Sequence, residues 1–489
     1  MSGTNHPCPE SCNVLLIGGG GREHALAWRL HQSPRCGTLW TTHPGNPGID
    51  AVAKPCEFCW DPTNFYPLTT WCTKNAIDLV VIGPEQPLAE GVADVMIEHG
   101  IRVFGPTQAG AQLESDKAFA KEIMRQAAIP TAESRTLQTA NAALRWAMRS
   151  FEPELDAKVE AGDMTFEPLL WWLRGSDDRG ERPMPALDTH IRDLLTSREE
   201  PMVVKAAGLA AGKGVVVCRT ALEAVEAIQA IMVERCFGEA GDRIIIEEML
   251  EGQEASILAL YDGETIWILD PCQDHKQVGE GDTGPNTGGM GAYCPTPVVD
   301  EAMLDLIERT VLIPLVDALR RNKIDYRGVI YAGMMLTPGG PKVLEFNCRF
   351  GDPECQPLMA RFQGDLLDTL WRTAAGTLID ADISFDPRHA CCVVLCSEGY
   401  PGSYEKGRPI EGADEVSNDD MILFHAGTTR DASGKLASSG GRVLSVTALD
   451  ASLVEARNRA NAALDAIQMP GGFFRRDIGH RIETMASLR

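Results

Sequence analysis

The beginning of the chain alternates short apolar runs with amphipathic stretches. In "NVLLIGGGGREHALAWRL" (13–30), an apolar run leads into glycines and then into a helical pattern of apolar residues. Further apolar runs end in Gly-Pro in "AIDLVVIGPE" (76–85) and "GIRVFGPT" (100–107). Strands that alternate with helices indicate a parallel, doubly wound sheet, whose ligands bind outside the carboxyl ends of the strands. We therefore predict an N-terminal α/β domain over residues 1–112 with a site at these turns.

The middle of the chain predicts a different arrangement of elements. A helical stretch at 113–130 is followed by two β-rich runs around a glycine loop in "PMVVKAAGLAAGKGVVVCR" (201–219), a hairpin-like pattern. More strands are expected at 243–250 and 254–269, and the composition shifts to that of a small α+β domain after residue 386. The domains expected are 113–386, with a lid over about 134–247, and 387–489.

The regular pattern is interrupted between about 150 and 200. This segment mixes acids and prolines with two adjacent tryptophans, Trp171 and Trp172. We interpret it as an insertion that its apolar patches order in part. A structural or flexible excursion is favoured over a partner site, because long surface insertions cost little stability.

A late strand carries the clearest candidate chemistry. In "KVLEFNCRFGDPE" (342–354), Leu344, Phe346, Cys348 and Phe350 alternate with Glu345, Asn347 and Arg349. Successive strand side chains point to opposite faces, so a carboxylate, an amide and a guanidinium share one face. Hard oxygen ligands such as the first two suit magnesium, and a guanidinium can stabilise a charged oxygen that develops during group transfer. A polar face paired with solvent is the disfavoured alternative.

Composition excludes several classes of protein. The 489 residues, 44% hydrophobic and 23% charged, indicate a multidomain globular protein. The formal net charge is −24 and no Lys/Arg run is present, so no nucleic-acid partner is expected. The sequence has neither an apolar window long enough to cross a membrane nor a secretory signal at its start, so no membrane partner is expected either.

The cysteines indicate reduced thiols in the cytoplasm. Fifteen are scattered along the chain, an odd number without a secretory signal. "CEFC" (56–59) has CxxC spacing, but no second tight pair follows, so packing is favoured over a metal or redox site.

Two glycine-rich motifs resemble nucleotide-binding loops without matching them. "GGGGREHA" (18–25) has Glu23 where the dinucleotide fingerprint requires glycine, which leaves a phosphate site at a helix N-terminus or a plain tight turn. "GLAAGKG" (208–214) has three residues rather than four between Gly208 and Gly212 and lacks the Walker A Ser/Thr. A mobile glycine loop between strands can instead close over a triphosphate, and Lys205 lies on the preceding apolar strand.

Two further segments are candidates for ligand binding. Backbone groups after the strand in "IIIEEML" (244–250) could contact an adenine edge, with acids nearby for ribose hydroxyls. "DHKQVGEGDTGPNTGGMGAYCP" (274–295) is a glycine-dense loop in which the backbone can approach a ligand closely, with a flexible surface loop as the alternative.

Together these motifs resemble a known family. The glycine loop, the "EEML" hinge and the Glu-x-Asn strand are similar to those of the ATP-grasp superfamily. "GGGGREHALAW", "VVIGPEQPLAEG", "IRVFGPTQAGAQLESDKAF", "GLAAGKGV", "QDHKQVGEGDTGPNTGGMGAY" and "LEFNCRFGDPE", in this order, resemble the phosphoribosylamine–glycine ligases within it. The resemblance covers nearly the whole chain except about 150–200. It implies a pre-ATP-grasp domain, a central ATP-grasp domain with a lid subdomain and a small C-terminal α+β domain.

The resemblance also implies an activity. Glycine would be phosphorylated by ATP to glycyl phosphate and then joined to 5-phosphoribosylamine, with Mg2+ or Mn2+ as cofactor, in de novo purine biosynthesis. We expect a monomer with this single activity.

Site residues follow from the resemblance, position by position. ATP phosphates would be contacted by Lys117 and Lys205 and covered by the loop of Gly208, Gly212, Lys213 and Gly214. Glu248 and Leu250 would flank the adenine, Glu254 would contact the ribose, and Glu345 and Asn347 would hold the metal. Phosphoribosylamine would be bound by Gly20, Gly21, Glu85, Asn286, Thr287, Gly288 and Gly289. Arg349 would lie by the acyl phosphate and Asp274 near a substrate amine, as the catalytic residues.

Two positions depart from the family, and three other functions remain open. Ala207 replaces the usual acid, and Gln277 the usual Arg, without removing a proposed metal ligand. The alternatives are another ATP-grasp carboxylate–amine ligase with a different acceptor, a nicotinamide-dependent oxidoreductase, and a catalytically inactive nucleotide-binding scaffold.

Overall fold

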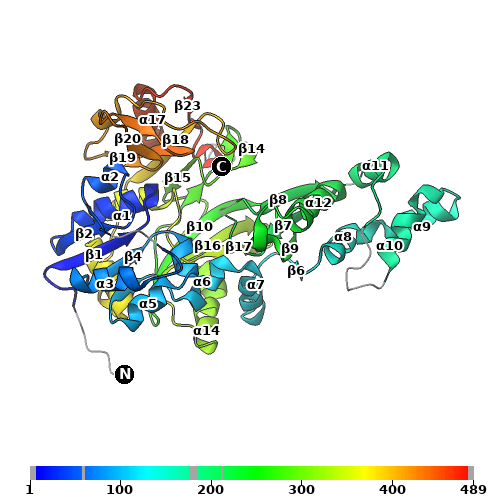
Figure 1. Cartoon of the computed structure of the whole chain (residues 1–489), viewed down its shortest axis with the longest axis horizontal. Coiled ribbons are helices and arrows are strands. Elements are labelled where there is room, and N and C mark those ends of the chain that lie inside the picture. The colour runs from blue at the N-terminus through cyan, green and yellow to red at the C-terminus, as the bar shows by residue number, and fades with distance from the viewer. Residues whose placement is uncertain (1–6, 58–60, 176–183, 198, 211–212, 483–489) are drawn as a thin grey trace. The chain divides into compact units, whose positions relative to one another are not determined.

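The computed structural model describes residues 7–57, 61–175, 184–197, 199–210 and 213–482. The chain divides into two compact units. Unit 1 combines Met1–Leu113 with Gln253–Arg489, and unit 2 is Glu114–Gly252. Figure 1 shows the chain as a cartoon, with many of its helices and strands labelled as below.

The first sheet of unit 1 is parallel throughout and has the strand order β3-β2-β1-β4-β5. Its core strands form because short runs of Val, Leu and Ile are buried on both faces, as in β1 and β4. The strand order reverses between β1 and β4, which makes the carboxyl ends of these two strands the topological switch point. The predicted doubly wound sheet is confirmed. Its strands are β1 (Cys12–Ile17), β2 (Cys36–Thr41), β3 (Lys54–Pro55), β4 (Leu79–Ile82) and β5 (Arg102–Phe104).

Helices connect these strands. The first helix begins where the Glu23 carboxylate accepts a hydrogen bond from the backbone N–H of Gly20 (2.7 Å), and its last turn carries the basic residues Arg29 and His31. The helices are α1 (Gly21–His31), α2 (Pro47–Asp50), α3 (Tyr66–Lys74), α4 (Glu85–Ala89), α5 (Val92–Glu98) and α6 (Gln108–Ser115).

The second sheet of unit 1 is antiparallel, in the order β11-β10-β16-β17. Its strands β10 and β16 are almost wholly buried, and the later part of β17 carries the polar side chains discussed below. The strands are β10 (Gln253–Tyr261), β11 (Ile266–Ile268), β16 (Gly328–Thr337) and β17 (Gly340–Asn347), and the helices that follow them or lie between them are α13 (Glu301–Ile307), α14 (Ile313–Arg321), α15 (Cys355–Arg361) and α16 (Leu366–Ala375).

The third sheet joins two distant parts of the sequence. It has the order β12-β15-β18-β22-β19, and β23 pairs with β18. The segment 274–295, predicted as a glycine-dense loop, instead supplies strands, because β15 pairs antiparallel with β18 about 100 residues later. Its α17 packs on β18 and β22. The elements are β12 (Gln273–Asp274), β15 (Gly291–Cys294), β18 (His389–Ser397), β19 (Met421–His425), β22 (Arg442–Asp450), β23 (Gly472–Phe473) and α17 (Leu453–Ala466), with two hairpins, β13 (Gln277–Gly279) with β14 (Thr283–Asn286), and β20 (Thr428–Arg430) with β21 (Leu436–Ser438).

Unit 2 contains an antiparallel sheet in the order β6-β9-β7-β8. The predicted pair of β-rich runs around a glycine loop is confirmed as β7 and β8, and the predicted helix at the start of the unit is α7, which Asp116 caps through the backbone N–H of Ala118 and Phe119. Its elements are β6 (Ser134–Leu137), β7 (Glu199–Ala206), β8 (Val215–Thr220), β9 (Ile244–Glu248), α7 (Lys117–Gln126), α8 (Ala140–Met148) and α12 (Ala221–Ile228).

The insertion in unit 2 is largely helical. After α8, which precedes it, the insertion forms α9 (Glu152–Glu160), α10 (Glu167–Arg174) and α11 (Thr189–Ser197). Figure 1 shows α9 and α10 packed together at one end of the unit. Trp172 is buried in the core cluster of unit 2. Trp171 is 60% exposed. Apolar residues thus pack in the described part of this segment, in agreement with the prediction that apolar patches order it in part.

The described residues bear on the predictions about membranes and cysteines. Within these residues, no helix is long and apolar enough to cross a membrane. Cys56 of the CxxC pair is half-buried and Cys59 lies outside the described residues. The described cysteines are free thiols and most are buried, as packing residues are.

Candidate active site

The glycine turn after β1 is fixed by a buried carboxylate. Gly18 has φ +115°, and a β-carbon there would lie 2.7 Å from Cγ of Glu23. Glu23 is buried; besides its bond to Gly20, its second oxygen lies 2.7 Å from Nε of Arg22. Glu23 thus shapes the turn from the position where the dinucleotide fingerprint requires glycine. Gly20 and Gly21 lie at the N-terminus of α1, where backbone N–H groups favour an anion.

The turn lies at the switch point, and Glu85 belongs to the same edge of the sheet. β1 and β4 are neighbours, and α4 begins at Glu85 directly after the Gly83-Pro84 that follows β4. Burial alone would raise the pKa of Glu85, but the guanidinium groups of Arg349 and Arg22 hold that pKa below its usual value. Glu85 is therefore ionised at neutral pH.

Strand β17 contains a bulge that the sequence did not predict. Its register against β16 shifts at Leu344, because the neighbouring residues Gly333 and Met334 of β16 are opposite Glu345 and Val343. Val343 is therefore buried and Leu344 only half-buried. The predicted alternation of Leu344 with Glu345, Asn347 and Arg349 is interrupted at this bulge.

Beyond the bulge the predicted alternation is confirmed. Phe346, Cys348 and Phe350 are buried, whereas Glu345, Asn347 and Arg349 are half-buried. The strand itself ends at Asn347, so Arg349 lies in the turn that follows.

The pair formed by Glu345 and Asn347 fits a divalent cation. A carboxylate and an amide oxygen, two residues apart on a half-buried strand face, are the hard donors that Mg2+ prefers. The negative charge of Glu345 acts on the neighbouring Glu254 and Lys276 and helps raise the pKa of both; larger effects leave the pKa of Glu254 lowered overall. The pair therefore lies beside further charged groups of unit 1.

Arg349 connects two other predicted site residues, Glu85 and Asn347. Its Nε donates to Oε2 of Glu85 (3.2 Å), and its Nη2 lies 3.5 Å from Oδ1 of Asn347. Its Nη1 donates to the carbonyl of Phe350 (3.2 Å). The residues predicted as metal ligand, catalytic group and substrate contact therefore meet around one guanidinium.

A second cluster contains Asp274, Lys276 and Glu254. The ammonium of Lys276 lies 2.8 Å from Oε2 of Glu254 and 3.9 Å from Oδ1 of Asp274. Burial raises the pKa of Asp274 to about 7, against the opposing effect of Lys276. Lys276 lowers the pKa of Glu254. Burial alone would lower the pKa of Lys276, but the two carboxylates raise it well above its usual value. The cluster thus holds one permanent ion pair and one carboxyl that titrates near neutral pH.

Glu354 lies in a buried hydrogen-bond network beside this cluster. Its Oε1 accepts hydrogen bonds from the hydroxyl of Tyr331 and from Oγ of Ser256, the latter at 3.1 Å. Glu354 is 3% exposed, because this network holds its carboxylate inside the protein.

Asp352 holds the turn of Gly288 and Gly289 together with the C-terminal sheet. Arg442 of β22 lies 2.9 Å from Oδ2 of Asp352 and donates to the carbonyls of Asp352 and Gly288, both at 2.6 Å. Tyr400 accepts a hydrogen bond from the backbone N–H of Gly288 (3.0 Å). Burial alone would raise the pKa of Asp352, but Arg442 and Arg22 keep it low.

The other residues predicted to contact phosphoribosylamine lie differently. Thr287 donates to the carbonyl of Lys276 (2.7 Å), which ties this turn to the acid–lysine cluster. Asn286 is exposed in β14 and pairs with Gln277. The structure thus brings the turns at Gly20–Gly21 and Gly288–Gly289 near Asp352, and leaves Asn286 on the surface.

Unit 2 carries its own charged cluster. Lys205 lies 2.8 Å from Oε2 of Glu247, and Lys121 lies 2.9 Å from Oε1. Glu247 is 2% exposed. Lys205 pairs with Ile245 on β9, two residues before Glu247, so both side chains lie on one face of the sheet. Glu247 thereby holds two ammonium groups, one of them on the strand that leads into the glycine loop.

The glycine loop and its surroundings complete unit 2. Gly214 accepts a hydrogen bond from the backbone N–H of Ala206 (2.8 Å), and Gly208 donates to the carbonyl of Ala240 (3.0 Å). The backbone of Lys117 donates to the carbonyl of Ala207 (2.9 Å). Lys213 is described and exposed, whereas Gly212 lies outside the described residues.

The predicted adenine contacts lie at the end of β9. Glu248 accepts a hydrogen bond from the backbone N–H of Glu133 (3.1 Å). Leu250 follows the strand and is half-buried.

Sequence reasoning missed five residues that organise these clusters. A lysine or glutamate inside an otherwise apolar stretch was the available signal for Glu247, as it was for Lys205. For Arg442 no local signal exists, because its partners are 90 and 154 residues away. The missed residues are Lys121, Glu247, Lys276, Asp352 and Arg442.

The fold and these clusters define the class of protein. A parallel switch-point domain, an antiparallel sheet with a glycine loop and paired lysines, and a late Glu-x-Asn strand are the parts of an ATP-grasp ligase. Family models of phosphoribosylglycinamide synthetase match its N domain at residues 12–114, its ATP-grasp (A) domain at 187–355 and its C domain at 390–481.

Similar proteins identify the family. Phosphoribosylamine–glycine ligase of Rhodopirellula baltica is 44% identical over 475 residues, 96% of this chain and 97% of the relative. The human trifunctional purine biosynthetic protein adenosine-3 is 41% identical over 96% of this chain, which spans 42% of that protein. The crystal structure of the Thermotoga maritima ligase has a TM-score of 0.70 at 27% identity and covers 95% of this chain and 100% of its own. The chain belongs to the phosphoribosylamine–glycine ligase family.

More distant structures show the shared fold alone. The biotin carboxylase domain of Hydrogenobacter thermophilus 2-oxoglutarate carboxylase, solved in complex with MgADP, ADP and bicarbonate, has a TM-score of 0.65 at 15% identity, over 96% of this chain and 92% of that one.

Proposed function

We propose that the chain joins glycine to 5-phosphoribosylamine at the expense of ATP, giving glycinamide ribonucleotide, ADP and phosphate, in purine biosynthesis. The observation that carries this is the meeting of Glu85, Asn347 and Arg349 at the switch point, where Arg22 of α1 donates to the carbonyl of Phe350. ATP and a divalent metal are the cofactors of this family. We favour Mg2+, with Mn2+ as the alternative.

The chemistry has two steps. A glycine carboxylate oxygen attacks the γ-phosphorus of ATP and ADP leaves, which makes glycyl phosphate. The amine of phosphoribosylamine then attacks the acyl carbon, phosphate leaves and the nitrogen loses a proton. Such transfers need positioning and charge stabilisation more than a protein nucleophile.

Unit 1 would supply the reacting centre. Glu345 and Asn347 would hold the metal, which when bound neutralises charge on nucleotide phosphates. The guanidinium of Arg349, oriented by ionised Glu85, would stabilise the acyl-phosphate oxygens. The N-terminus of α1 at Gly20 and Gly21 would bind the sugar phosphate.

Asp274 is suited to take the proton that the amine loses. A general base works best with a pKa near the working pH, and burial raises the pKa of this carboxyl to about 7. Glu254 would contact the ribose of ATP, and its ion pair with Lys276 keeps it ionised for hydroxyl groups to donate to. The turn of Asn286, Thr287, Gly288 and Gly289 would complete the phosphoribosylamine site.

Unit 2 would supply the groups for the nucleotide. Lys117 and Lys205 would contact phosphates, under the loop that includes Gly208, Gly212, Lys213 and Gly214. Glu248 and Leu250 would flank the adenine. Buried Glu247 supports this assignment, because it holds the ammonium of Lys205 in place beside the loop.

The test is ADP formation by the purified chain. We expect ADP only when glycine and phosphoribosylamine are both present. A response to a different carboxylate, with none to glycine, would support another ATP-grasp ligase. NADH titration followed by fluorescence tests the oxidoreductase alternative, and we expect no saturable binding because Glu23 fills the turn.

A further inference from the structure

A groove of about 560 Å³ lies along the outer edge of the first sheet of unit 1. Its floor is the edge strand β5, and its walls come from the end of α5, the segment before β16, and α16. Ile97 and Ile101 contribute an apolar side, and Ile97 is 45% exposed. This volume falls within the range of sites for small organic molecules.

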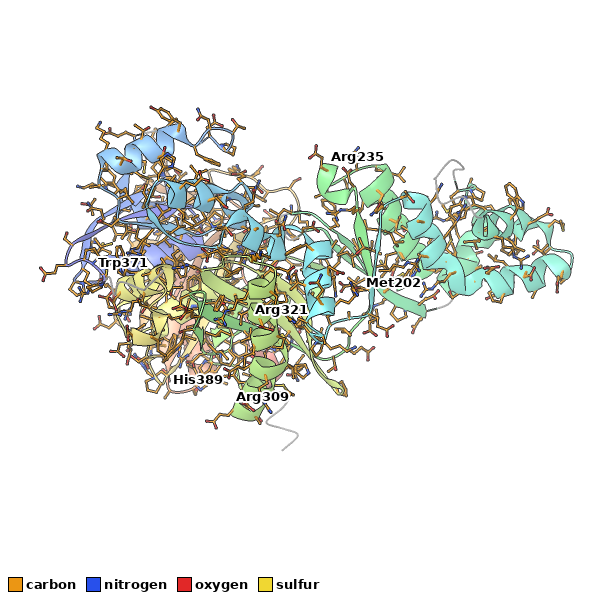
Figure 2. All side chains as sticks on the ribbon, turned by 90° about the horizontal axis from the view of Figure 1, so that it is seen from below. Met202, Arg235, Arg309, Arg321, Trp371 and His389 are labelled. Carbon is orange, nitrogen blue, oxygen red and sulfur yellow. The ribbon has the colours of Figure 1, made fainter. Side chains whose placement is uncertain are left out.

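Arg102 on β5 is the distinctive group of this groove. Its guanidinium carbon lies 4.5 Å from the centroid of the Trp371 ring, which Figure 2 labels, so one face of the guanidinium is covered. Within the described part of the chain, its N–H donors make no hydrogen bond or ion pair. A stacked, half-buried guanidinium with unused donors is a preorganised acceptor site for an oxyanion.

Arg327 adds a second positive charge to the same groove. It uses Nε on Oδ1 of Asp325 (3.4 Å) and Nη1 on the carbonyl of Ala374 (2.9 Å). Burial lowers the pKa of Arg102 most, and repulsion by Arg327 lowers it further. The two aspartates of the groove, Asp78 and Asp325, are not among the groups that raise this pKa. The other aspartate, Asp78, accepts the backbone N–H of Asn13 (2.8 Å). The two guanidinium groups thus repel each other, and a bound anion would relieve that repulsion.

The groove shares no lining residue with the active site described above. It includes Asp78 and Ile101, at the amino ends of β4 and β5, and it extends along the edge strand to Gly105 and Thr107, past the carboxyl end of β5. Gly20 and Glu85 lie beyond the carboxyl ends of β1 and β4. A ligand in the groove would therefore leave the reacting centre free.

We propose that this groove binds a small organic anion, with a phosphate or carboxylate group held by Arg102 and Arg327 and a flat apolar body lying against Ile97 and Ile101. The planar fork of Arg102 matches two oxygens of either group. The isoleucines supply the apolar contact that an inorganic ion would not use.

The test is calorimetric titration of the full chain at constant ionic strength with phenyl phosphate, benzoate and, as the uncharged body, phenol. Each titration is repeated with Arg102→Met, Arg327→Met and Arg102→Lys. The matched control is Arg321→Met, an arginine that Figure 2 also labels, which is 60% exposed at its side chain and pairs with Asp317 on α14. ADP formation in each variant reports that it is folded, since none of these arginines belongs to the active site.

We expect saturable binding of at least one of the two anions, at least tenfold weaker in Arg102→Met and Arg327→Met, intermediate in Arg102→Lys, and unchanged in Arg321→Met. Preference for phenyl phosphate or for benzoate identifies the head group. The proposal is overturned if neither anion binds saturably, if phenol binds as well as they do, or if Arg102→Met and Arg327→Met bind as the wild type does, which would place the anion at the active-site turn.

Discussion

Replacement of Asp274 by asparagine should make the protein more stable and less active. The carboxyl is 7% exposed, and burial raises its pKa to about 7 from an ordinary value of 3.8. An acid with a raised pKa in the folded state binds a proton that the unfolded chain has already lost. Stability therefore falls as pH rises between these two values, and the amide variant escapes that loss.

The magnitude follows from the shift in pKa. A difference of about three units at about 1.4 kcal/mol per unit gives a penalty of about 4 kcal/mol in the free energy of unfolding above pH 7. Below pH 4 the carboxyl is protonated in both the folded and the unfolded state, and the penalty disappears. The advantage of Asp274→Asn should thus grow by about 1.4 kcal/mol per pH unit between pH 4 and 7 and then level off.

Urea unfolding at pH 5, 6, 7 and 8 measures this difference, with ADP formation followed in parallel. Asp305→Asn is the control, because Asp305 is 60% exposed and pairs with Arg309 on the surface; its effect should not vary in this way. Two results would refute the assignment of a buried, titrating carboxyl. One is an Asp274→Asn variant that is less stable than the wild type at pH 8. The other is a variant whose gain in the free energy of unfolding is as large at pH 5 as at pH 8.

Three further predictions concern neighbouring charges. Lys276→Met removes the cation that lowers the pKa of Asp274 against the effect of burial. The acidic limb of the profile of kcat/KM against pH should therefore move up by about one pH unit or more. A limb that stays in place or moves to lower pH would contradict this. Glu247→Gln leaves two lysine ammonium groups without their shared carboxylate, and urea unfolding should show unit 2 destabilised by about 3–5 kcal/mol. The control Glu226→Gln, at an exposed ion pair, should change the stability little. Arg349→Met should lower kcat by about 100-fold or more, measured as ADP formation, with Arg309→Met as the surface control; a loss confined to KM would argue against its role at the acyl phosphate.

Local patterns predicted the elements of this chain well where neighbours in sequence are neighbours in space. The strand–turn–helix at 13–30 and the two β runs around residues 208–214 needed only hydrophobic periodicity and glycine. The segment 274–295 was predicted as a loop because its strands are short and glycine-rich. Its β15 is stabilised by pairing with β18, whose position no local pattern reveals.

In the candidate site, too, local features could be predicted from the sequence and features that depend on distant strands could not. Glu345, Asn347 and Arg349 could be found from alternation along one strand. The bulge at Leu344 could not, because it depends on the register against β16. Resemblance to the family supplied Asp274, but not the burial that gives its carboxyl a pKa near neutrality.

Paired charges were the least predictable feature. A carboxylate in "IIIEEML" gives no indication that Glu247 faces two lysines, because Lys121 lies on a helix more than 100 residues earlier. Likewise, Arg442 reaches Asp352 from the C-terminal sheet. Such pairs follow from topology, and they decide which side chains of the site are held rigid.

The most direct test of the account is ADP formation from ATP, glycine and phosphoribosylamine by the wild type and by Glu345→Ala, with the melting temperature of both measured. We predict turnover that needs both co-substrates, and its near abolition in Glu345→Ala at an unchanged melting temperature. A wild-type rate in this variant would contradict the central claim that Glu345 and Asn347 bind the metal of an ATP-dependent ligase.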